Sequence, residues 1–581
     1  MTYSNPPDPV PPIDGDNFNS VEYDPPDRDP VNVPSDVFEL GLVMAGAVSA
    51  GAYIAGVMDF LIEALDVWEQ KKAEPGFSGP KHRTLLKVIT GASGGAMNGA
   101  IAVANLNHKF KHIRSGETAG QTENPFFDAW VNDIDISLLL ALEDLSGDNP
   151  EIRSILDSTE LDAIARRSLT PPPDAEPIER GYLNDPLRLM LTVTNLRGIP
   201  HWIGLSGNTK QGHGMLMHRD HLRFALQGPS NGGLYPDELH LQYPADMSSQ
   251  SWVSLAKAAL ATGAFPAFLK PRDISRPFKD YKFRNVFKNV LPETKKYRAV
   301  QAAKYDFSDG EYNFLAADGG TMNNEPLEMA RRVLAGAFGR NPRDGLKAKR
   351  ATIMIDPFPE MPSLGPENGL NINPISSVMA LASAWKSESR FRAQDLALAG
   401  DNHVYSRFLL APSRRDHDQI SRGARITSEA LGAFGGFLSR HFRVHDYLLG
   451  RRNCQRFLSH NFTLPEQHQL FKSWDINDRQ DYLVPRHGDQ KDHLPIIPLI
   501  KGSAVEAEEP IPSWPTGLYD RSSIEPLIEQ RFDAIFDAAM KKLEIPWYQK
   551  LYLKPLKWAA RNKLCQFASE KIAADLDRMN L

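Results

Sequence analysis

The stretch from Leu85 to Leu106 reads LLKVITGASGGAMNGAIAVANL. An apolar run up to Thr90 is followed by Gly-Ala-Ser-Gly-Gly and then by an alanine-rich segment, which predicts a strand, a sharp turn and a helix. In a G-x-S-x-G elbow, glycines two before and two after the serine (here Gly91 and Gly95) let strand and helix pass closely. Ser93 at the apex is therefore a candidate nucleophile. The alternative is a glycine-rich turn without chemistry.

The composition of the 581-residue chain is that of an ordinary globular protein with room for two or three domains. A net charge of −6 argues against a general nucleic-acid-binding protein. The two cysteines, Cys454 and Cys565, lie far apart and imply no disulfide framework. A reducing compartment fits this usage, so we expect a cytoplasmic protein.

The first 36 residues are rich in proline and aspartate and lack a basic segment followed by an apolar core. This composition is not that of a secretory signal peptide. We expect residues 1–36 to be a disordered or loosely tethered arm.

A second glycine-containing loop lies in the uncharged stretch between Glu39 and Asp59, which reads LGLVMAGAVSAGAYIAGVM. Its length could span a bilayer, but its many alanines and glycines weaken that interpretation. We expect a buried strand over Phe38–Met44, a small-residue loop over Ala45–Gly51 and a helix over Ala52–Trp68. Such a loop presents successive N–H groups to an anion.

A third motif is found in Tyr312–Glu328, which reads YNFLAADGGTMNNEPLE. Asp318 at a strand end, followed by Gly319 and Gly320, suits a carboxylate presented in a tight turn. Strands alternate with helices up to about residue 360, and beyond that point the apolar spacing is mostly helical. We therefore expect an α/β domain over residues 37–360 and a mostly helical region over residues 361–581.

These three blocks, in this order, resemble the patatin-like phospholipase family. The family's first block reads roughly V-L-G-G-G-G-A-R-G, and Val43–Gly51 matches it in length. The elbow at Gly91–Gly95 and the D-G-G motif at Asp318 match the second and third blocks. The stretch AALATGAFPAFLKP (Ala258–Pro271) is similar to a further family block, and Phe437–Leu458 is similar to C-terminal segments of larger bacterial members.

The resemblance implies a three-layer α/β fold around a central, mainly parallel sheet. It also implies a catalytic dyad in which Ser93 forms an acyl-enzyme and Asp318 is the base. The backbone N–H groups of Gly46, Ala47 and Val48 would form the oxyanion hole. The implied substrate is a phospholipid or another acyl-ester lipid, and no metal or cofactor is expected.

The glycine loop departs from the family pattern. Ala45, Ala47 and Val48 stand where the family has glycines, and Ala50 stands where it has arginine. A valine still carries a backbone N–H, but its Cβ fits the loop only at negative φ. Loss of one oxyanion donor typically lowers kcat by ~10²–10³.

Two rival functions remain open. One is an ordinary α/β-hydrolase with a Ser–Asp–His triad, for which histidines occur late in the chain at 403, 417, 441, 445 and 460. His441 and His445 lie four apart in a predicted helix, where an exposed helix face is the simpler interpretation. The other rival is a non-catalytic membrane-binding protein on a patatin-like scaffold.

Ile545–Lys563 reads IPWYQKLYLKPLKWAARNK and has no acidic residue. On a helix, its basic residues at 550, 554, 557 and 561 share one face, with aromatic residues among them. This pattern suits a membrane surface. The alternative is that the aromatic side chains pack on the core and the basic face is solvated.

Overall fold

The computed structural model of the chain describes residues 13–14, 33–147, 150–205, 208–227, 234–235, 237–283, 285–291, 296–301, 310–335, 341–358, 388, 390, 393–414, 424–486, 491–543 and 547–581. The predicted arm at residues 1–36 lies almost entirely outside these ranges. Most of the basic stretch at residues 279–304 also falls on residues whose side chains are not described.

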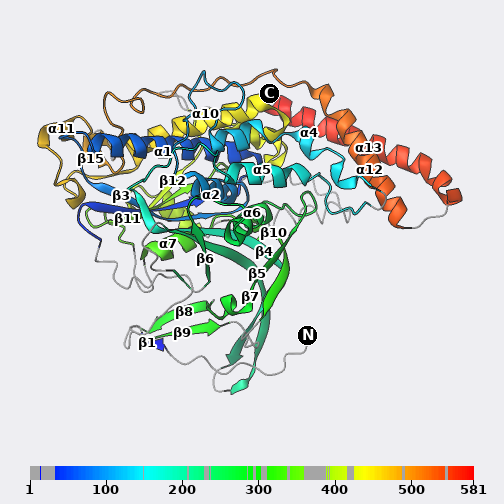
Figure 1. Cartoon of the computed structure of the whole chain (residues 1–581), viewed down its shortest axis with the longest axis horizontal. Coiled ribbons are helices and arrows are strands. Elements are labelled where there is room, and N and C mark those ends of the chain that lie inside the picture. The colour runs from blue at the N-terminus through cyan, green and yellow to red at the C-terminus, as the bar shows by residue number, and fades with distance from the viewer. Residues whose placement is uncertain are drawn as a thin grey trace, which may run out of the picture.

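A mostly parallel sheet crosses the centre of the molecule (Figure 1). Within the described residues it has nine strands, with the main order β12-β11-β2-β3-β4-β10-β7 and with β5 and β6 continuing from β4. The four strands β12, β11, β2 and β3 are parallel, β3 pairs with β4 in parallel, and β10 is antiparallel to β4. The strands are β2 (Val37–Met44), β3 (Arg83–Gly91), β4 (Leu183–Leu205), β5 (Asn208–Gln227), β6 (Glu238–Gln242), β7 (Arg272–Pro277), β10 (Glu311–Asp318), β11 (Arg350–Ile355) and β12 (Arg407–Leu410).

Helices cover both faces of this sheet, which is why its central strands are mostly apolar. All residues of β2 are buried, as expected for a parallel strand covered on both sides. Leu42 and Met44 belong to the large core cluster under α1 (Gly51–Lys72), α2 (Ser93–Asn105) and α6 (Gln250–Thr262). Val43, between them, packs with α7 (Leu327–Ala335) on the other face. The predicted three-layer α/β fold is confirmed.

The segment with the length and composition of a membrane span lies inside the protein. Of the described helices, the one over Val48–Lys72 is long and apolar enough to cross a membrane, and 94% of its most apolar window is buried. The predicted strand, loop and helix are present as β2, the short 3₁₀ helix η3 (Val48–Ala50) and α1.

The chain after residue 360 is mostly helical, but it is not separate from the sheet. Its strand β12 extends the main sheet beside β11. Its helix α10 (Arg440–Arg456) lies along α1 (Figure 1). The two backbones approach so closely that only glycine fits at two positions. A Cβ on Gly56 would lie 1.9 Å from the Tyr447 carbonyl oxygen, and one on Gly450 would lie 2.1 Å from the Tyr53 carbonyl oxygen. The predicted boundary near residue 360 therefore does not coincide with the end of the sheet or of the core.

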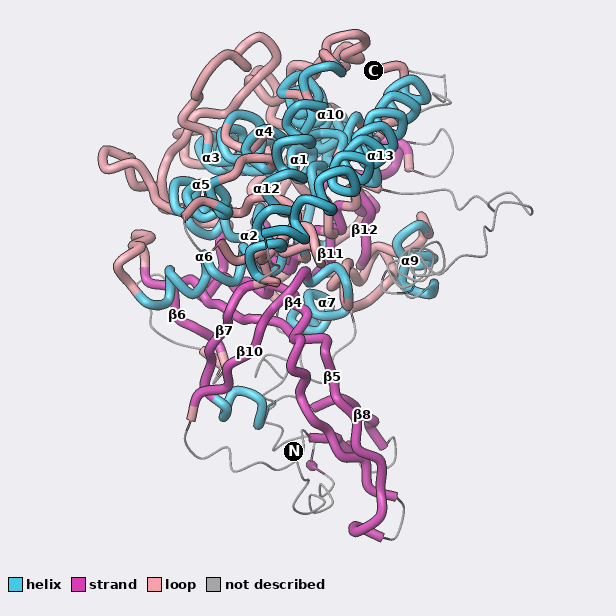
Figure 2. Tube along the Cα trace, turned by 90° about the vertical axis from the view of Figure 1, so that its right-hand side faces the viewer, coloured by secondary structure: helices cyan, strands magenta, loops and turns pink. Residues whose placement is uncertain are grey.

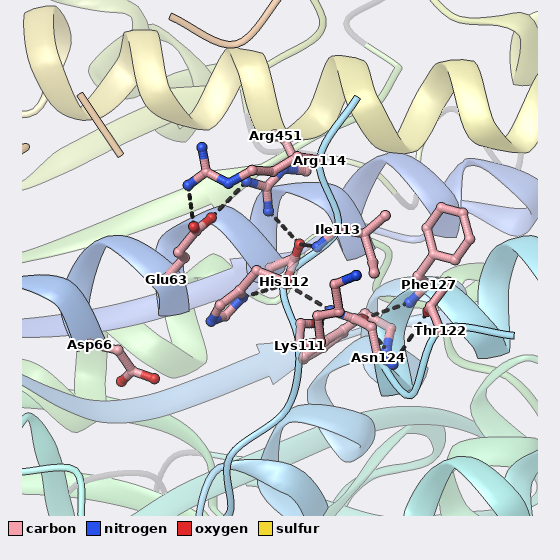
Figure 3. Close-up of polar contacts among 12 residues, drawn as sticks. Glu63, Asp66, Lys111, His112, Ile113, Arg114, Thr122, Asn124, Phe127 and Arg451 are labelled. Carbon is pink, nitrogen blue, oxygen red and sulfur yellow. Dashed lines mark hydrogen bonds and ion pairs between the residues drawn. The ribbon is translucent and has the colours of Figure 1, made fainter. Parts of the chain in front are cut away.

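A buried ionic cluster joins these two helices (Figure 3). Arg451 of α10 contacts Asp59 and Glu63 of α1, with 2.6 Å between Nη2 and Glu63 Oε2, and also contacts Glu509. Asp59 further accepts hydrogen bonds from His112 and Asn124 at 2.7 and 2.9 Å. Segments that are almost 400 positions apart in the sequence are thus held by charge pairing.

The helices α12 (Glu525–Lys542) and α13 (Trp547–Met579) form a hairpin that projects from one end of the molecule (Figure 1). Lys557 bonds Asp537 at 2.8 Å and Arg561 bonds Asp533 at 3.1 Å, both across to α12. Lys557 and Arg561, two of the four residues of the predicted membrane-facing basic face, therefore point toward α12. The side chains at 550 and 554 lie outside the described residues.

Smaller elements complete the chain. The strands β4 and β5 continue beyond the sheet as a long two-stranded arm beside β8 (Figure 2). The remaining elements are β1 (Ile13–Asp14), β8 (Asn285–Leu291), β9 (Lys296–Gln301), β13 (Thr463–Pro465), β14 (Val484–Pro485), β15 (Lys491–Pro495), α3 (Pro125–Phe127), α4 (Ile136–Leu139), α5 (Thr159–Leu169), α9 (Ala393–Gly400) and α11 (Ile476–Gln480).

Candidate active site

Ser93 lies at the predicted sharp turn, between the end of β3 and the first turn of α2. Its φ is +50°, in the left-handed region that a non-glycine residue seldom occupies. Its backbone N–H donates to Thr262 Oγ1 at 2.9 Å. A serine held in this conformation between strand and helix has the geometry of a nucleophile elbow.

The elbow glycines are required by close approach of the backbone. A Cβ on Gly95 would lie 2.5 Å from the carbonyl oxygens of Met44 and Ala45, and one on Gly91 would lie 2.7 Å from the amide of Ala96. The other motif glycines are equally crowded. Gly51 lies against Trp130, Gly319 against the backbone of Thr192, and Gly320 against the side chains of Asn324 and Asp318.

Asp318 is the last residue of β10 and is buried. Its N–H donates to the Ala264 carbonyl at 2.9 Å, and its own carbonyl accepts from Thr194 Oγ1 at 2.7 Å. Its carboxylate Oδ1 accepts the Gly320 N–H at 2.9 Å. The D-G-G turn thus holds the carboxylate by its own backbone, as predicted.

The sheet register brings the elbow and the aspartate to the same end of β4. Gly91 of β3 pairs with Leu191, and Asp318 of β10 pairs with Val193 on the other side of β4. Two interstrand spacings separate β3 from β10 by roughly 10 Å at the backbone. The amides of Ser93 and Asp318 are also both held by the end of α6, through Thr262 and Ala264.

The glycine loop packs on the start of α2, beside Ser93. A Cβ on Gly94 would lie 3.1 Å from the Val48 carbonyl oxygen and 3.4 Å from the Ala47 Cβ. The Gly46 N–H donates to the Asn324 carbonyl at 3.1 Å, so its predicted role as an oxyanion donor is not met in this structure. Across the described residues, the amides of Ala47, Val48 and Gly94 have no hydrogen-bond partner. In that part of the chain, these three amides therefore remain unbonded at the loop and the elbow.

Val48 lies outside the negative-φ region in which a valine Cβ fits without strain. Its φ is +46°, a strained conformation for a β-branched residue. Its side chain is partly buried and lines the same pocket as Ser93.

We expect Val48→Gly to leave hydrolysis of a short-chain ester within about threefold of wild type, because the N–H is retained. Relief of about 1–3 kcal/mol of backbone strain offsets the lost side-chain contacts, so stability should change little. The preferred acyl-chain length should shift, because the side chain lines the pocket. Val48→Ala is the matched control, since it shortens the side chain but retains positive φ. A loss of activity with an unchanged circular dichroism spectrum would contradict this account.

An apolar pocket lies against Ser93 between α2, α5 and α6. It contains about 870 Å³ of empty space, including its open mouth. No charged residue and no histidine is among the described residues that line it. Its walls include Met97, Ile101, Trp130, Leu161, Ile164 and Leu269. A pocket with these walls suits an acyl chain.

The histidines of the triad alternative lie elsewhere. His445, predicted on an exposed helix face, is buried. Its ring lies against Trp514, and its Nδ1 is 2.8 Å from Asp446 Oδ1. His441 is exposed, as predicted, and His417 lies outside the described residues. In the part of the chain that the structure describes, no cluster of three or more His, Cys, Asp or Glu side chains could hold a metal ion.

Three residues of the site were not identified from the sequence. The Gly94 amide follows from the elbow motif itself, since the residue after the nucleophile commonly supplies an oxyanion donor. Thr262 and Asn324 lie within stretches that resemble family blocks, but their contacts depend on the folded arrangement of α6 and of the loop after β10.

Comparison with known proteins agrees with this geometry. Residues 42–331 match the family described as patatin-like phospholipase. The chain is also 33% identical over 522 residues to the uncharacterized protein y4iI of Sinorhizobium fredii (strain NBRC 101917 / NGR234), covering 82% of this chain and 72% of that protein. The match spans the glycine loop, the elbow and the D-G-G turn, and we conclude that the chain belongs to the patatin-like phospholipase family.

Proposed function

We propose that this protein is a lipid acyl hydrolase of the phospholipase A or lysophospholipase type, which cleaves carboxylic esters through Ser93 and Asp318. One observation carries the proposal. A serine in a strained turn lines a charge-free apolar pocket, beside backbone amides that have no partner among the described residues. This arrangement provides a nucleophile, a site for an acyl chain and donors for an oxyanion.

In the first half-reaction, Ser93 Oγ attacks the ester carbonyl carbon and its proton passes to the Asp318 carboxylate. The carbonyl oxygen becomes an oxyanion, which the amides of Ala47, Val48 and Gly94 stabilise. The intermediate collapses with cleavage of the bond to the alcohol oxygen. That oxygen takes the proton from Asp318 and leaves, and the acyl group remains on Ser93.

In the second half-reaction, Asp318 accepts a proton from water, and the resulting hydroxide attacks the acyl-enzyme. The same amides stabilise the second oxyanion. Collapse releases the fatty acid, and the proton returns from Asp318 to Ser93 Oγ. The net change is hydrolysis of one ester bond, with both side chains restored.

The test is a comparison of lipids by mass spectrometry after exposure to wild type or to Ser93→Ala. We expect free fatty acid and a deacylated lipid only with wild type. A fluorophosphonate probe should label wild type at Ser93. Absence of both labelling and lipid turnover in folded wild type would favour the rival function of a non-catalytic membrane-binding protein.

We further propose that the α12–α13 hairpin makes peripheral contact with the lipid surface. Phe567, Trp558 and Leu564 of α13 are 67%, 61% and 43% exposed. Lys563 and Lys571 are exposed near them. Exposed aromatic and basic side chains together suit an anionic headgroup layer.

The double variant Leu564→Ser/Phe567→Ser should bind anionic phosphatidylglycerol vesicles about 10- to 100-fold more weakly. Each apolar side chain contributes about 1.5–3 kcal/mol on full burial, and the headgroup layer buries these side chains only in part. Hydrolysis of a soluble short-chain ester should be unchanged. Ile476→Ser is the control, because Ile476 is 70% exposed on α11, at the other end of the molecule (Figure 1). Unchanged vesicle binding by the double variant would remove the hairpin from this role.

A further inference from the structure

A segment of the helical C-terminal region forms part of the wall of the Ser93 pocket. We call residues 427–438 the strap; it comprises the 3₁₀ segments η8 (Thr427–Ala433) and η9 (Gly435–Leu438) with Phe434 between them. Phe434 and Phe437 line the pocket together with Ser93. The Phe434 ring lies 5.9 Å from that of Phe265, on the loop that follows α6. The pocket is therefore completed by residues far beyond the matched family domain.

The strap is bonded to the glycine loop through one side chain. Ser49 Oγ donates to the Ala433 carbonyl at 2.5 Å and accepts the Gly436 N–H at 3.0 Å. Ser49 is fully buried and directly follows Val48. A Cβ on Gly436 would lie 2.8 Å from Ser49 Oγ, so the two segments are in close contact. The Ser49 hydroxyl therefore joins the glycine loop to the strap through two hydrogen bonds, one that it donates and one that it accepts.

The strap is itself held in an unusual conformation. Leu431, Gly432 and Ala433 have φ of 54°, 62° and 87°, three consecutive residues in the left-handed region. Such strain persists only when surrounding contacts impose it.

The C-terminal helices supply those contacts. The Asp446 carboxylate of α10 accepts the N–H groups of Thr427 and Ser428 at 2.9 and 3.0 Å. Arg443 of α10 donates to the Gly436 carbonyl at 3.0 Å. The Leu431 N–H donates to Asp575 of α13 at 2.9 Å. The conformation of the strap thus depends on both α10 and α13.

We propose that Ser49 is a positioning residue for ester hydrolysis, through which the C-terminal region holds the amides of Ala47 and Val48 in place. This inference rests on the proposed hydrolase function. Val48 at positive φ would relax toward an ordinary conformation if its neighbour were released. Relaxation would turn the amides away from the developing oxyanion, where only correctly oriented donors stabilise charge. The C-terminal region is then part of the catalytic site, not an appendage to it.

Ser49→Ala in the full chain tests this proposal on a soluble short-chain ester. We expect kcat to fall about 10- to 100-fold and KM to stay within about twofold, because oxyanion donors act mainly in the transition state. The rate of fluorophosphonate labelling at Ser93 should fall in parallel. Ser49→Cys keeps the shape and a weak hydrogen-bonding group, so its kcat should lie between those of wild type and Ser49→Ala, and it serves as the test if the alanine variant does not fold.

Ser154→Ala is the matched control, since Ser154 is also buried and donates to a carbonyl, that of Leu156, at 2.7 Å, outside the pocket lining. It should lower the melting temperature without changing kcat. If Ser49→Ala and Ser49→Cys likewise lower only the melting temperature, or raise KM at constant kcat, the proposal is overturned. Wild type that neither hydrolyses esters nor takes the label would overturn the proposed function, and this inference with it.

Discussion

Ser93→Ala is expected to lower ester hydrolysis by about 10⁴-fold or more. The variant retains the backbone of the elbow and the N–H bond to Thr262, so the fold should be unchanged. It removes only the oxygen that forms the acyl-enzyme. Initial rates on a short-chain ester, with circular dichroism as the check on folding, measure the effect.

Asp318→Asn is expected to be nearly as severe. The asparagine side chain still offers an oxygen to the Gly320 N–H, so the turn after β10 keeps its hydrogen bond while the base is lost. Because the two groups act together, the double variant should be no worse than the more damaging single variant. Additive losses would mean that Ser93 and Asp318 act separately.

The same experiment separates the dyad from the Ser–Asp–His alternative. No described histidine lines the pocket, and His445 is bonded to Asp446 within the helical region. Replacing His445 by glutamine should therefore alter stability more than kcat. High activity in Asp318→Asn, together with its loss on replacement of a histidine, would establish the triad instead.

The elbow, the glycine loop and the D-G-G turn could all be predicted from the sequence because each is a local pattern. Each combines an apolar strand with small residues at a turn, and its conformation depends mainly on neighbours in the chain. The crowding around Gly91, Gly95 and Gly319 shows why these positions carry no side chain. Whether Gly46, Ala47 or Val48 supplies an oxyanion donor depends on a distant loop, since Asn324 accepts the Gly46 N–H.

The patterns on the late helices predict amphipathic faces but not what those faces contact. Lys557 and Arg561 share a face, yet that face meets Asp533 and Asp537 of α12. His445 is buried on a face of α10 where its ring lies against Trp514. A basic or polar helix face is equally compatible with solvent, with a membrane or with a charged neighbour.

The contacts that could not be predicted from the sequence join segments far apart in the chain. Ser49 bonds a carbonyl 384 positions away, and Arg451 pairs with Asp59 over 392 positions. The strand β12 joins the sheet after a long interruption. Such groups come together only in the folded protein. The apolar periodicity of a single segment does not indicate which distant segment it will contact.

Arg451→Ala is expected to destabilise the protein by about 3–5 kcal/mol, because it leaves buried carboxylates without their counter-ion. Arg451 and Asp59 are fully buried, and Glu63 and Glu509 are 6% and 4% exposed. Figure 3 shows Arg451 and Arg114 both reaching Glu63. Without Arg451, Glu63 keeps Arg114 and Asp59 keeps His112, but Glu509 loses its ion pair. Urea unfolding at pH 7 measures the loss. Arg456→Ala is the control on the same helix, since the Arg456 side chain is 38% exposed and its pairing with Glu508 is weak.

The pH dependence of this effect has a definite sign. Burial alone would raise the pKa of Asp59, but Arg451 and His112 more than offset it and hold the pKa well below its usual range. The pair therefore stabilises the fold above the unfolded pKa of about 3.9, and this contribution is lost as the pH falls further. The difference in stability between wild type and Arg451→Ala should be largest near neutral pH and should shrink below pH 4.

A charge-compensated variant shows whether the cost comes from unpaired charge or from lost packing. Arg451→Met combined with Asp59→Asn, Glu63→Gln and Glu509→Gln removes the arginine together with the charges of its three partners. Methionine fills much of the space of the arginine side chain. Because replacement of a buried ion pair by neutral groups is often close to neutral, this variant should recover most of the stability that Arg451→Ala loses. Recovery of stability would show that charge pairing in this cluster holds α1 and α10 together. A loss equal to that of Arg451→Ala would instead assign the effect to packing around the Arg451 side chain.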